Sequence, residues 1–196
     1  MAMTVEDLIR KNRTCRRFYG NKAITEDTLK QLVNLARLSA SAGNKQPLKY
    51  ILSWEKKQNK SIFPCLAWAG YLKEWKGPKE DERPTAYIVI TGDTTITDNF
   101  WCDHGIAAQS ILLGARELSL AGCMIGAFNE KKLRTALNIP DHLTILLVLA
   151  LGKPKESVVI EEVGDDNDIK YWRDKSGSHH VPKRKLEDII VDYSDT

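Results

Sequence analysis

The spacing of hydrophobic residues predicts two amphipathic helices at the start of the chain. Thr4 opens a T-x-x-D helix start, and the apolar positions that follow keep a helical period until just before Arg13. A second helix is predicted from Thr25 to Ser39 or Ala40, with one apolar face. The arginine-rich stretch between these helices and the small polar residues after the second one are therefore expected to lie in loops.

Two continuous apolar runs farther along predict buried strands. Residues 86–91 and 143–151 are almost wholly apolar, which is typical of strands covered on both faces. Residues 98–120 carry the longest helical pattern, with apolar or small residues around most of the circumference. We expect that helix to be buried in the fold or between subunits. Shorter patterns predict strands over 48–54 and 123–125 and a helix from Asn129 to Pro140.

Two regions lack such a pattern. Residues 56–83 mix charged and aromatic side chains, and we expect short helical pieces and a mobile loop there. The acidic residues 161–168 are interpreted as a loop, and the short apolar tail 186–191 is expected to dock at a distance, on its own core or on a partner subunit. The prediction is a single domain over residues 1–196, with a C-terminal extension from about residue 155.

Composition fits one globular domain. Of the 196 residues, 42% are hydrophobic and 28% are charged, which favours a packed core over disorder. The 29 basic and 26 acidic residues give a net charge of +3, too balanced to indicate a nucleic-acid partner. The four cysteines form no C-x-x-C pair and no secretory signal opens the chain, so we expect free thiols and a cytoplasmic location. No apolar run approaches the roughly 20 residues of a membrane span.

The arginine segment, residues 13–17, concentrates three guanidinium groups and the hydroxyl of Thr14. Guanidinium forks and hydroxyl groups are suited to holding a phosphate. A solvated basic loop is the simpler alternative for a cluster of this kind. A second basic stretch, residues 183–185, is interpreted either as a further contribution to an anion site or as surface charge.

The Ser/Asn segment, residues 41–47, is rich in small residues and amides. Its side chains and backbone suit a planar polar ligand, although a polar turn between a helix and a strand explains the composition equally well. Gly126 follows a predicted strand and is placed to let backbone groups approach a flat ligand, with a plain strand and turn as the alternative. Together, the segments indicate a phosphorylated ligand that contains a ring.

The sequence lacks the motifs of several other enzyme classes. It contains no G-x-S-x-G elbow, no G-x-x-x-x-G-K-[ST] loop and no G-x-G-x-x-G fingerprint. His179-His180 has no accompanying zinc motif, and Asp103-His104 is more simply a helix-surface or interface pair than a catalytic dyad. We therefore predict no metal site and no catalytic side chain.

In order and spacing, the motifs of this chain resemble those of the FMN-dependent nitroreductase family over most of its length. The matching stretches are residues 13–18, 41–47, 103–109, 123–128 and 149–154, followed by the basic tail. The resemblance implies an α+β fold with a central mixed sheet wrapped by helices. It also implies an intertwined homodimer with two FMN sites at the subunit interface.

The same resemblance assigns residues to the cofactor. The residues that match phosphate ligands are Arg13, Thr14 and Arg16, with Lys183 or Arg184 from the basic tail. Two stretches match residues that face the flavin. Ser41, Ala42 and Asn44 match the stretch that reaches the flavin bound mainly by the partner chain. Ile125 and Gly126 match the stretch beside the isoalloxazine ring.

The resemblance also implies the reaction. Hydride passes from NADH or NADPH through FMN to a nitroaromatic, quinone or similar small-molecule acceptor in ping-pong turnover, and the cofactor supplies the chemistry. A flavin-binding protein with a storage or sensing role is the alternative, because it would share every binding motif. Ala40 stands where Pro is frequent in the family and Leu48 where Trp is frequent, so we expect the pocket to differ in shape.

Overall fold

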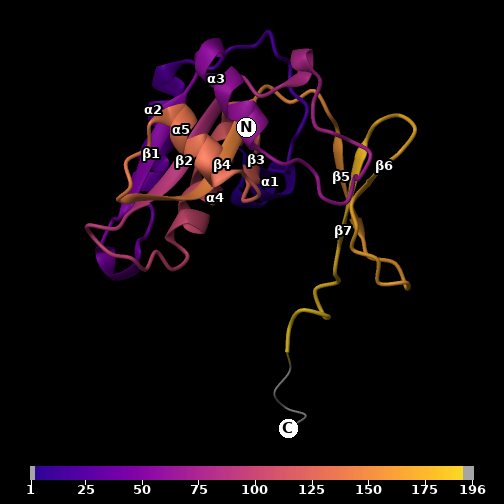
Figure 1. Ribbon diagram of the computed structural model, residues 1–196. Helices are drawn as coiled ribbons and strands as arrows, with labels where there is room; N and C mark the ends of the chain where they lie inside the picture. Colours follow the sequence, from indigo (N-terminus) through magenta and orange to yellow (C-terminus); the bar gives the residue numbers. More distant parts are fainter. Residues whose placement is uncertain (1–2, 192–196) are drawn as a thin grey trace.

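The computed structural model describes residues 3–191 and shows an α+β architecture (Figure 1). Its elements in chain order are α1 (Val5–Lys11), α2 (Glu26–Arg37), β1 (Leu48–Ser53), α3 (Lys56–Ile62), β2 (Ala86–Asp93), α4 (Asp103–Glu117), β3 (Ala121–Ile125), α5 (Glu130–Leu137), β4 (Leu143–Gly152), β5 (Val158–Glu162), β6 (Trp172–Arg173) and β7 (His179–Lys183). One-turn 3₁₀ helices lie at Ala42–Asn44, Phe63–Cys65 and Glu80–Glu82. The predicted α+β class is confirmed.

The main sheet has the order β1-β2-β4-β3, and every neighbouring pair in it is antiparallel. Ile88 of β2 lies opposite both Leu52 of β1 and Leu149 of β4, which fixes the register at the centre. The sheet predicted as mixed is thus antiparallel throughout in the described chain. β2 and β3 do run in the same direction, but β4 lies between them, so no parallel pair forms.

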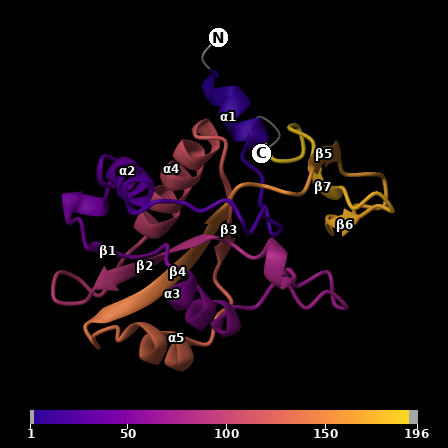
Figure 2. The ribbon, with the colours of Figure 1, turned by 90° about the horizontal axis from the view of Figure 1, so that it is seen from above.

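Helices cover both faces of this sheet, with α2 and α4 on one face and α3 and α5 on the other (Figure 2). Because successive side chains of a strand point to opposite faces, β2 divides its residues between two cores. Ile88 and Ile90 pack in the core with α2 and α4, whereas Tyr87 and Val89 pack in the core with α3 and α5. All eight residues of β2 are buried, as expected for a central strand.

Most helix starts match their predicted positions because the capping residues are local signals. The side chains of Thr4, Thr25 and Asn129 each accept a backbone N–H from the first turn of a helix. The start predicted at residue 98 is wrong, because α4 begins only at Asp103. Trp101, just before it, has a φ of 45°, a left-handed conformation that ends any regular helix. The predicted end of α2 is also slightly too late.

A second, three-stranded sheet lies beside the main body (Figure 1), and the hydrophobic pattern gave no sign of it. Its order is β5-β7-β6, with β5 parallel and β6 antiparallel to β7. The loop predicted over residues 161–168 is therefore wrong at Glu161 and Glu162, which belong to β5. These strands are only two to five residues long and mostly half-buried or exposed, so neither an apolar run nor a clear alternation marks them. We call residues 155–191 the arm.

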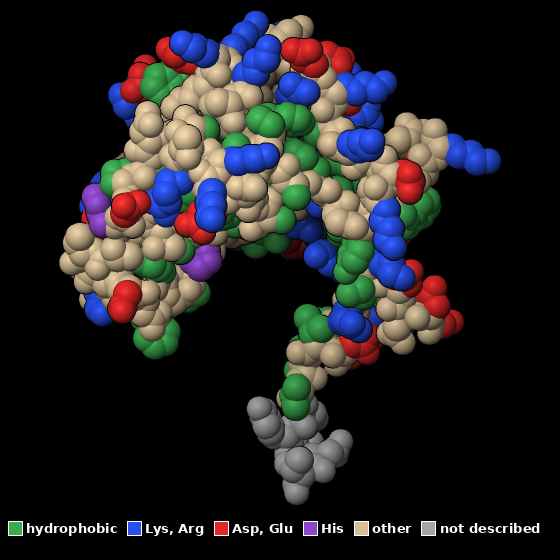
Figure 3. Space-filling model, in the orientation of Figure 1, with side chains coloured by type: hydrophobic (Ala, Val, Ile, Leu, Met, Phe, Trp, Pro, Cys, Tyr) green, Lys and Arg blue, Asp and Glu red, His purple; other side chains and the backbone are tan. Residues whose placement is uncertain are grey.

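The last part of the arm extends away from the body (Figure 3). Leu186, Ile189, Ile190 and Val191 are each more than 60% exposed. Docking of this tail on a partner subunit stays a prediction, and residues 192–196 of the predicted extension lie outside the described residues.

The visible face of the body mixes Lys and Arg side chains with Asp and Glu side chains (Figure 3). This intermixing agrees with the small net charge of +3. Among residues 3–191, no helix combines the length and apolar character needed to cross a bilayer.

Gly122 of β3 has no room for a side chain. A Cβ atom there would lie 2.5 Å from Cδ2 of Leu112 and 2.9 Å from the carbonyl oxygen of Ala150. Gly122→Ala should therefore lower the free energy of unfolding by about 1–3 kcal/mol through overpacking, measured by urea denaturation. Gly126→Ala is the matched control, because nothing lies within 4 Å of its added Cβ. Equal losses in the two variants would contradict the packing explanation.

Candidate functional site

The arginine segment is fixed to the main sheet through its middle residue, Cys15, and is held next to the sheet by Phe18, which follows it. The backbone N–H of Cys15 donates to the carbonyl oxygen of Gly122 at 2.9 Å, and Phe18 forms a bridge with Pro154 just after β4. Cys15 and Phe18 are buried. The polar side chains around them are half-buried or exposed. The segment is thus a loop, as predicted, on an anchored backbone.

The side chain of Arg17 forms an ion pair with another residue of the same chain. Its guanidinium group donates two hydrogen bonds to the carboxylate of Glu82, at 2.8 and 2.6 Å. Hydrogen bonding from Arg17, with a further contribution from Lys155, lowers the pKa of Glu82 to about 2. Lys155 lies 2.9 Å from the same carboxylate. The positive charge of Arg17 is therefore already compensated within the protein and is not available to a bound anion.

Arg13 and Arg16 differ from Arg17 because their guanidinium groups form no ion pair among the described residues. Arg13 donates only to two backbone carbonyl groups at the end of α1. The guanidinium of Arg16 contacts two uncharged rings, those of His179 and Tyr171. Thr14 lies exposed between them. Two uncompensated guanidinium groups and a hydroxyl, within four residues of sequence, form a donor set suited to an anion.

Glu156 of the arm holds the backbone of the arginine segment in place. Its carboxylate accepts the backbone N–H groups of Arg16 and Arg17 and a hydrogen bond from the guanidinium of Arg173 at 2.9 Å. The Glu156 side chain is fully buried, and a buried carboxylate is favourable only with hydrogen-bond donors such as these. Sequence reasoning missed Glu156, because 140 residues separate it from Arg16 and no local motif links them.

His179 and Tyr171 of the arm lie against the side chain of Arg16. Nη1 of Arg16 is 3.3 Å from Nε2 of His179, and the guanidinium carbon is 4.8 Å from the centre of the Tyr171 ring. Burial, and then the charge of Arg16, lower the pKa of His179 to about 4. The imidazole is therefore neutral at pH 7 and accepts the hydrogen bond from Arg16. The arm covers one side of this guanidinium without neutralising it.

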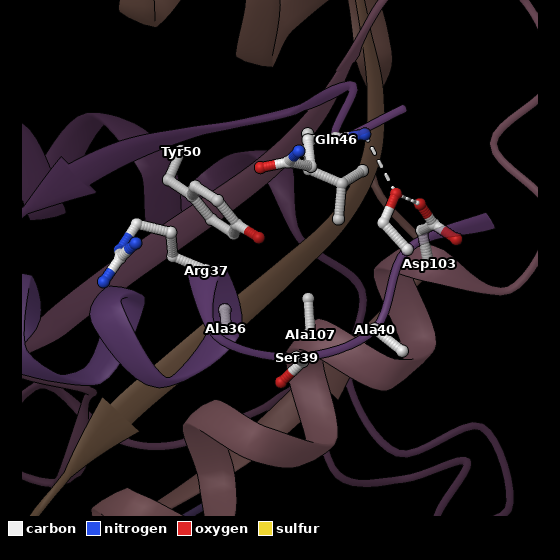
Figure 4. A pocket seen from close by; sticks show the side chains of 10 residues that line it. Ala36, Arg37, Ser39, Ala40, Gln46, Tyr50, Asp103 and Ala107 are labelled. Carbon is white, nitrogen blue, oxygen red and sulfur yellow. Dashed lines mark hydrogen bonds between the residues drawn. The ribbon is translucent and has the colours of Figure 1, made fainter. Parts of the chain in front are cut away.

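The Ser/Asn segment is anchored by the first residue of α4. Oγ of Ser41 donates to Oδ2 of Asp103 at 2.6 Å, and the N–H of Gln46 donates to Oγ of Ser41 at 2.9 Å (Figure 4). The N–H of Ala42 donates to Oδ1 of the same carboxylate at 3.0 Å. Asp103 is only 3% exposed, so it is not a helix-surface residue. It is an internal anchor whose partner lies 62 residues away in sequence. The interface alternative for Asp103-His104 stays a prediction.

Four other predicted cofactor residues lie at, or just after, the ends of β3 and β7. Ile125 ends β3 with its side chain buried in the core, whereas Gly126 is exposed, with open space where a Cβ atom would be. Lys183 and Arg184 are exposed at the far end of β7 from His179, the residue that contacts Arg16. The described arm thus brings His179, rather than the basic tail, to the arginine segment.

The described residues show no cluster that could hold a metal ion, and three of the four thiols are buried. A metal site would need a group of three or more His, Cys, Asp or Glu side chains, and the described residues contain none. The four cysteines are free thiols, as predicted. Burial raises the pKa of Cys15 to about 12 and that of Cys123 to about 11, so both stay protonated at pH 7.

Comparison with known proteins decides the family. The model of the nitroreductase family matches residues 9–153, which is most of the chain. The chain belongs to the nitroreductase family. An Archaeoglobus fulgidus relative named "Putative NADH dehydrogenase/NAD(P)H nitroreductase" is 26% identical over 157 residues, covering 76% of this chain and 85% of its own length. The resemblance stated from the motifs is confirmed, and so is the class of enzyme, an oxidoreductase.

Solved nitroreductase structures share the fold. A nitroreductase family protein from Clostridium novyi NT matches with a TM-score of 0.68 and 28% identity, over 78% of this chain and 88% of the other. A protein from Exiguobacterium sibiricum 255-15, described as a "putative nitroreductase in complex with FMN", matches with a TM-score of 0.65 and 16% identity, over 79% and 90% of the two chains. At that identity the second likeness concerns the fold alone.

The neutral state of His179 makes stability depend on pH. The unfolded chain takes up a proton near pH 6.5, whereas the native ring stays neutral down to about pH 4, so stability falls as the pH drops between these values. The free energy of unfolding should fall by about 2 kcal/mol between pH 7 and pH 5 because of this group. His179→Gln should remove that part of the dependence in urea titrations, and His142→Gln, on an exposed turn, should keep it. Identical pH profiles for all three proteins would refute this assignment.

Proposed function

We propose that this protein is an FMN-dependent oxidoreductase that passes electrons from NADH or NADPH to a small acceptor such as a nitroaromatic or a quinone. The observation that carries the proposal is the pair of guanidinium groups, Arg13 and Arg16, that lack an ion-pair partner among the described residues. A phosphate monoester brings nearly two negative charges at pH 7 and would compensate both. The NAD(P)H in the name of the A. fulgidus relative and the FMN bound by the E. sibiricum protein support the same cofactors here.

The residues of this chain fit FMN at its phosphate and at its ring. Arg13, Thr14 and Arg16 would hold the phosphate, on a backbone that Glu156 keeps in place. Open space at Gly126 leaves its backbone accessible to a flat ring. Ile125 would contribute backbone groups only, since its side chain is buried. A contribution from Lys183 or Arg184 stays part of the proposal as a contact from the tail.

The proposal includes a homodimer, because the two segments lie apart in one chain. Figure 2 shows the chain between α2 and β1 on the opposite side of the molecule from the small sheet that covers the arginine segment. Ser41, Ala42 and Asn44 would therefore serve the flavin held by the arginine segment of the partner subunit. Asp103 then acts as a positioning residue, because its carboxylate fixes the first two of these residues.

FMN would supply reversible two-electron chemistry when bound. The contribution of this chain is to bind, orient and shield the cofactor. Placement in the cytoplasm stays a prediction.

The proposed reaction is tested with the visible spectrum of the purified protein and its anaerobic reduction. We expect a yellow protein, or one that becomes yellow with added FMN, and bleaching of the flavin absorbance by NADH or NADPH. Bleaching by neither nicotinamide would contradict the reductase and leave flavin storage or sensing. A colourless protein that takes up no FMN would contradict both roles.

Arg16→Ala should weaken FMN binding by roughly 10- to 100-fold, because a charge-assisted hydrogen bond to phosphate contributes about 1.5–3 kcal/mol. Fluorescence titration of the apoprotein with FMN measures the dissociation constant. Arg10→Ala is the matched control, since Arg10 lies nearby on α1 but pairs with Glu6 in solvent. If both variants bind FMN like the wild type, Arg16 does not hold the phosphate.

A further inference from the structure

Residues 67–79, which we call the bridging loop, lie beside the small sheet of the arm (Figures 1 and 2). They form turns, closed by hydrogen bonds from the N–H of Leu72 to the carbonyl of Ala69 and from the N–H of Trp75 to the carbonyl of Leu72. Two aromatic residues of this loop, Tyr71 and Trp75, contact the arm. The loop therefore packs against the arm without belonging to its sheet.

One face of the small sheet is directed toward the arginine segment. Tyr171 and Arg173 are two residues apart on extended chain, so their side chains share a face, and His179 lies opposite Arg173 in the register. The ring of Trp172 lies on the other face, where it stacks on the ring of His180 with 4.1 Å between the centres. The bridging loop contacts the first of these faces.

A first series of contacts links Trp75 to the backbone of the arginine segment. The guanidinium carbon of Arg173 lies 4.4 Å from the centre of the Trp75 ring. The same guanidinium donates to the carboxylate of Glu156 at 2.9 Å, and that carboxylate accepts the backbone N–H groups of Arg16 and Arg17. The side chain of Arg173 is only 17% exposed, so the indole ring limits the positions open to its guanidinium group.

A second series of contacts links Tyr71 to the side chain of Arg16. The backbone N–H of Tyr71 donates to the hydroxyl of Tyr171 at 3.3 Å, and the centres of the two rings are 4.9 Å apart. The ring of Tyr171 lies in turn 4.8 Å from the guanidinium carbon of Arg16. The bridging loop thus contacts the arm residues that hold both the backbone and the side chain of Arg16.

Arg173 also supplies the positive charge that Glu156 needs. A buried carboxylate without a cation close by is strongly unfavourable. Arg16 lies next to this carboxylate through its backbone N–H, so without Arg173 its guanidinium group would be attracted to Glu156. With Arg173 in place, the guanidinium of Arg16 contacts only uncharged rings and keeps its charge for an anion. Donors that already hold their geometry also lose less conformational freedom when a ligand binds.

We propose that Trp75 and Arg173 are positioning residues for the phosphate of the cofactor. Arg173 compensates Glu156 and so leaves the guanidinium of Arg16 available to the phosphate, and Trp75 keeps Arg173 on Glu156. Both residues act through Glu156 and not by contact with the phosphate. The assignment rests on the proposed function.

The role of Trp75 is tested by fluorescence titration of the full-chain apoprotein with FMN and with riboflavin, which lacks the phosphate. Trp75→Ala should weaken FMN binding about 5-fold, because the cation–π contact is lost, and leave riboflavin binding unchanged. Trp75→Phe keeps an aromatic face and should restore most of the FMN affinity. Trp172→Ala is the matched control, because its ring lies on the opposite face of the sheet, and it should leave FMN binding unchanged.

A double-mutant cycle tests the connection through Glu156. Glu156→Gln keeps the size of the side chain and removes the charge that Arg173 compensates. Trp75→Ala should therefore weaken FMN binding about 5-fold in the wild-type background and hardly at all in the Glu156→Gln background. Additive losses in the double variant overturn the connection through Glu156.

The phosphorus-31 NMR spectrum of the FMN-saturated protein gives a second readout, which does not need riboflavin to bind. The phosphate resonance should move toward that of free FMN in Trp75→Ala and stay in place in Trp172→Ala. An unchanged resonance in both variants overturns the positioning role.

The titrations separate the remaining outcomes. Equal FMN affinity in Trp75→Ala and the wild type overturns the positioning role. An equal loss of FMN and riboflavin affinity, or an equal loss in Trp172→Ala, also overturns it, because either result indicates a general weakening of the arm. A wild type that binds neither flavin overturns the proposed function, and with it this assignment. Failure of NADH and NADPH to bleach bound flavin overturns the reductase alone.

Discussion

Strand β2 must be covered on both faces, and the position of every functional segment depends on how that is achieved. Its eight residues are all buried, and their side chains alternate between two cores. Ile88 and Ile90 are shielded from water only if α2 and α4 pack over them. Tyr87 and Val89 are shielded from water only if α3 and α5 pack over the other face. Once α4 is fixed in this way, its first residue, Asp103, has a fixed place. The core therefore determines where the Ser/Asn segment lies.

Features that are signalled locally could be predicted from the sequence. The caps at Thr4, Thr25 and Asn129 mark their helices, because a cap acts on the next three residues. The continuous apolar runs of β2 and β4 mark strands that are buried on both sides. The order of the sheet was not accessible, since nothing in the pattern says that β4 enters between β2 and β3.

The candidate site was predictable only in part, because its anchors act over long sequence distances. Asp103 reaches across 62 residues and Glu156 across 140, and neither spacing carries a periodic signal. Composition also gives no means to distinguish the roles of the three arginines in the arginine segment. The structure separates them, because Glu82 neutralises Arg17 while the other two keep their charge. Resemblance to the family had already named Arg13 and Arg16.

The contact between Arg16 and His179 has a thermodynamic consequence. The same guanidinium group contacts the arm and is the group assigned to an anion, so the two interactions are linked through one side chain. If anion binding changes the equilibrium constant for contact between the arm and Arg16 by some factor, formation of that contact changes the affinity for the anion by the same factor. Affinity for a phosphorylated cofactor is then a property of the arm as much as of the loop that holds it.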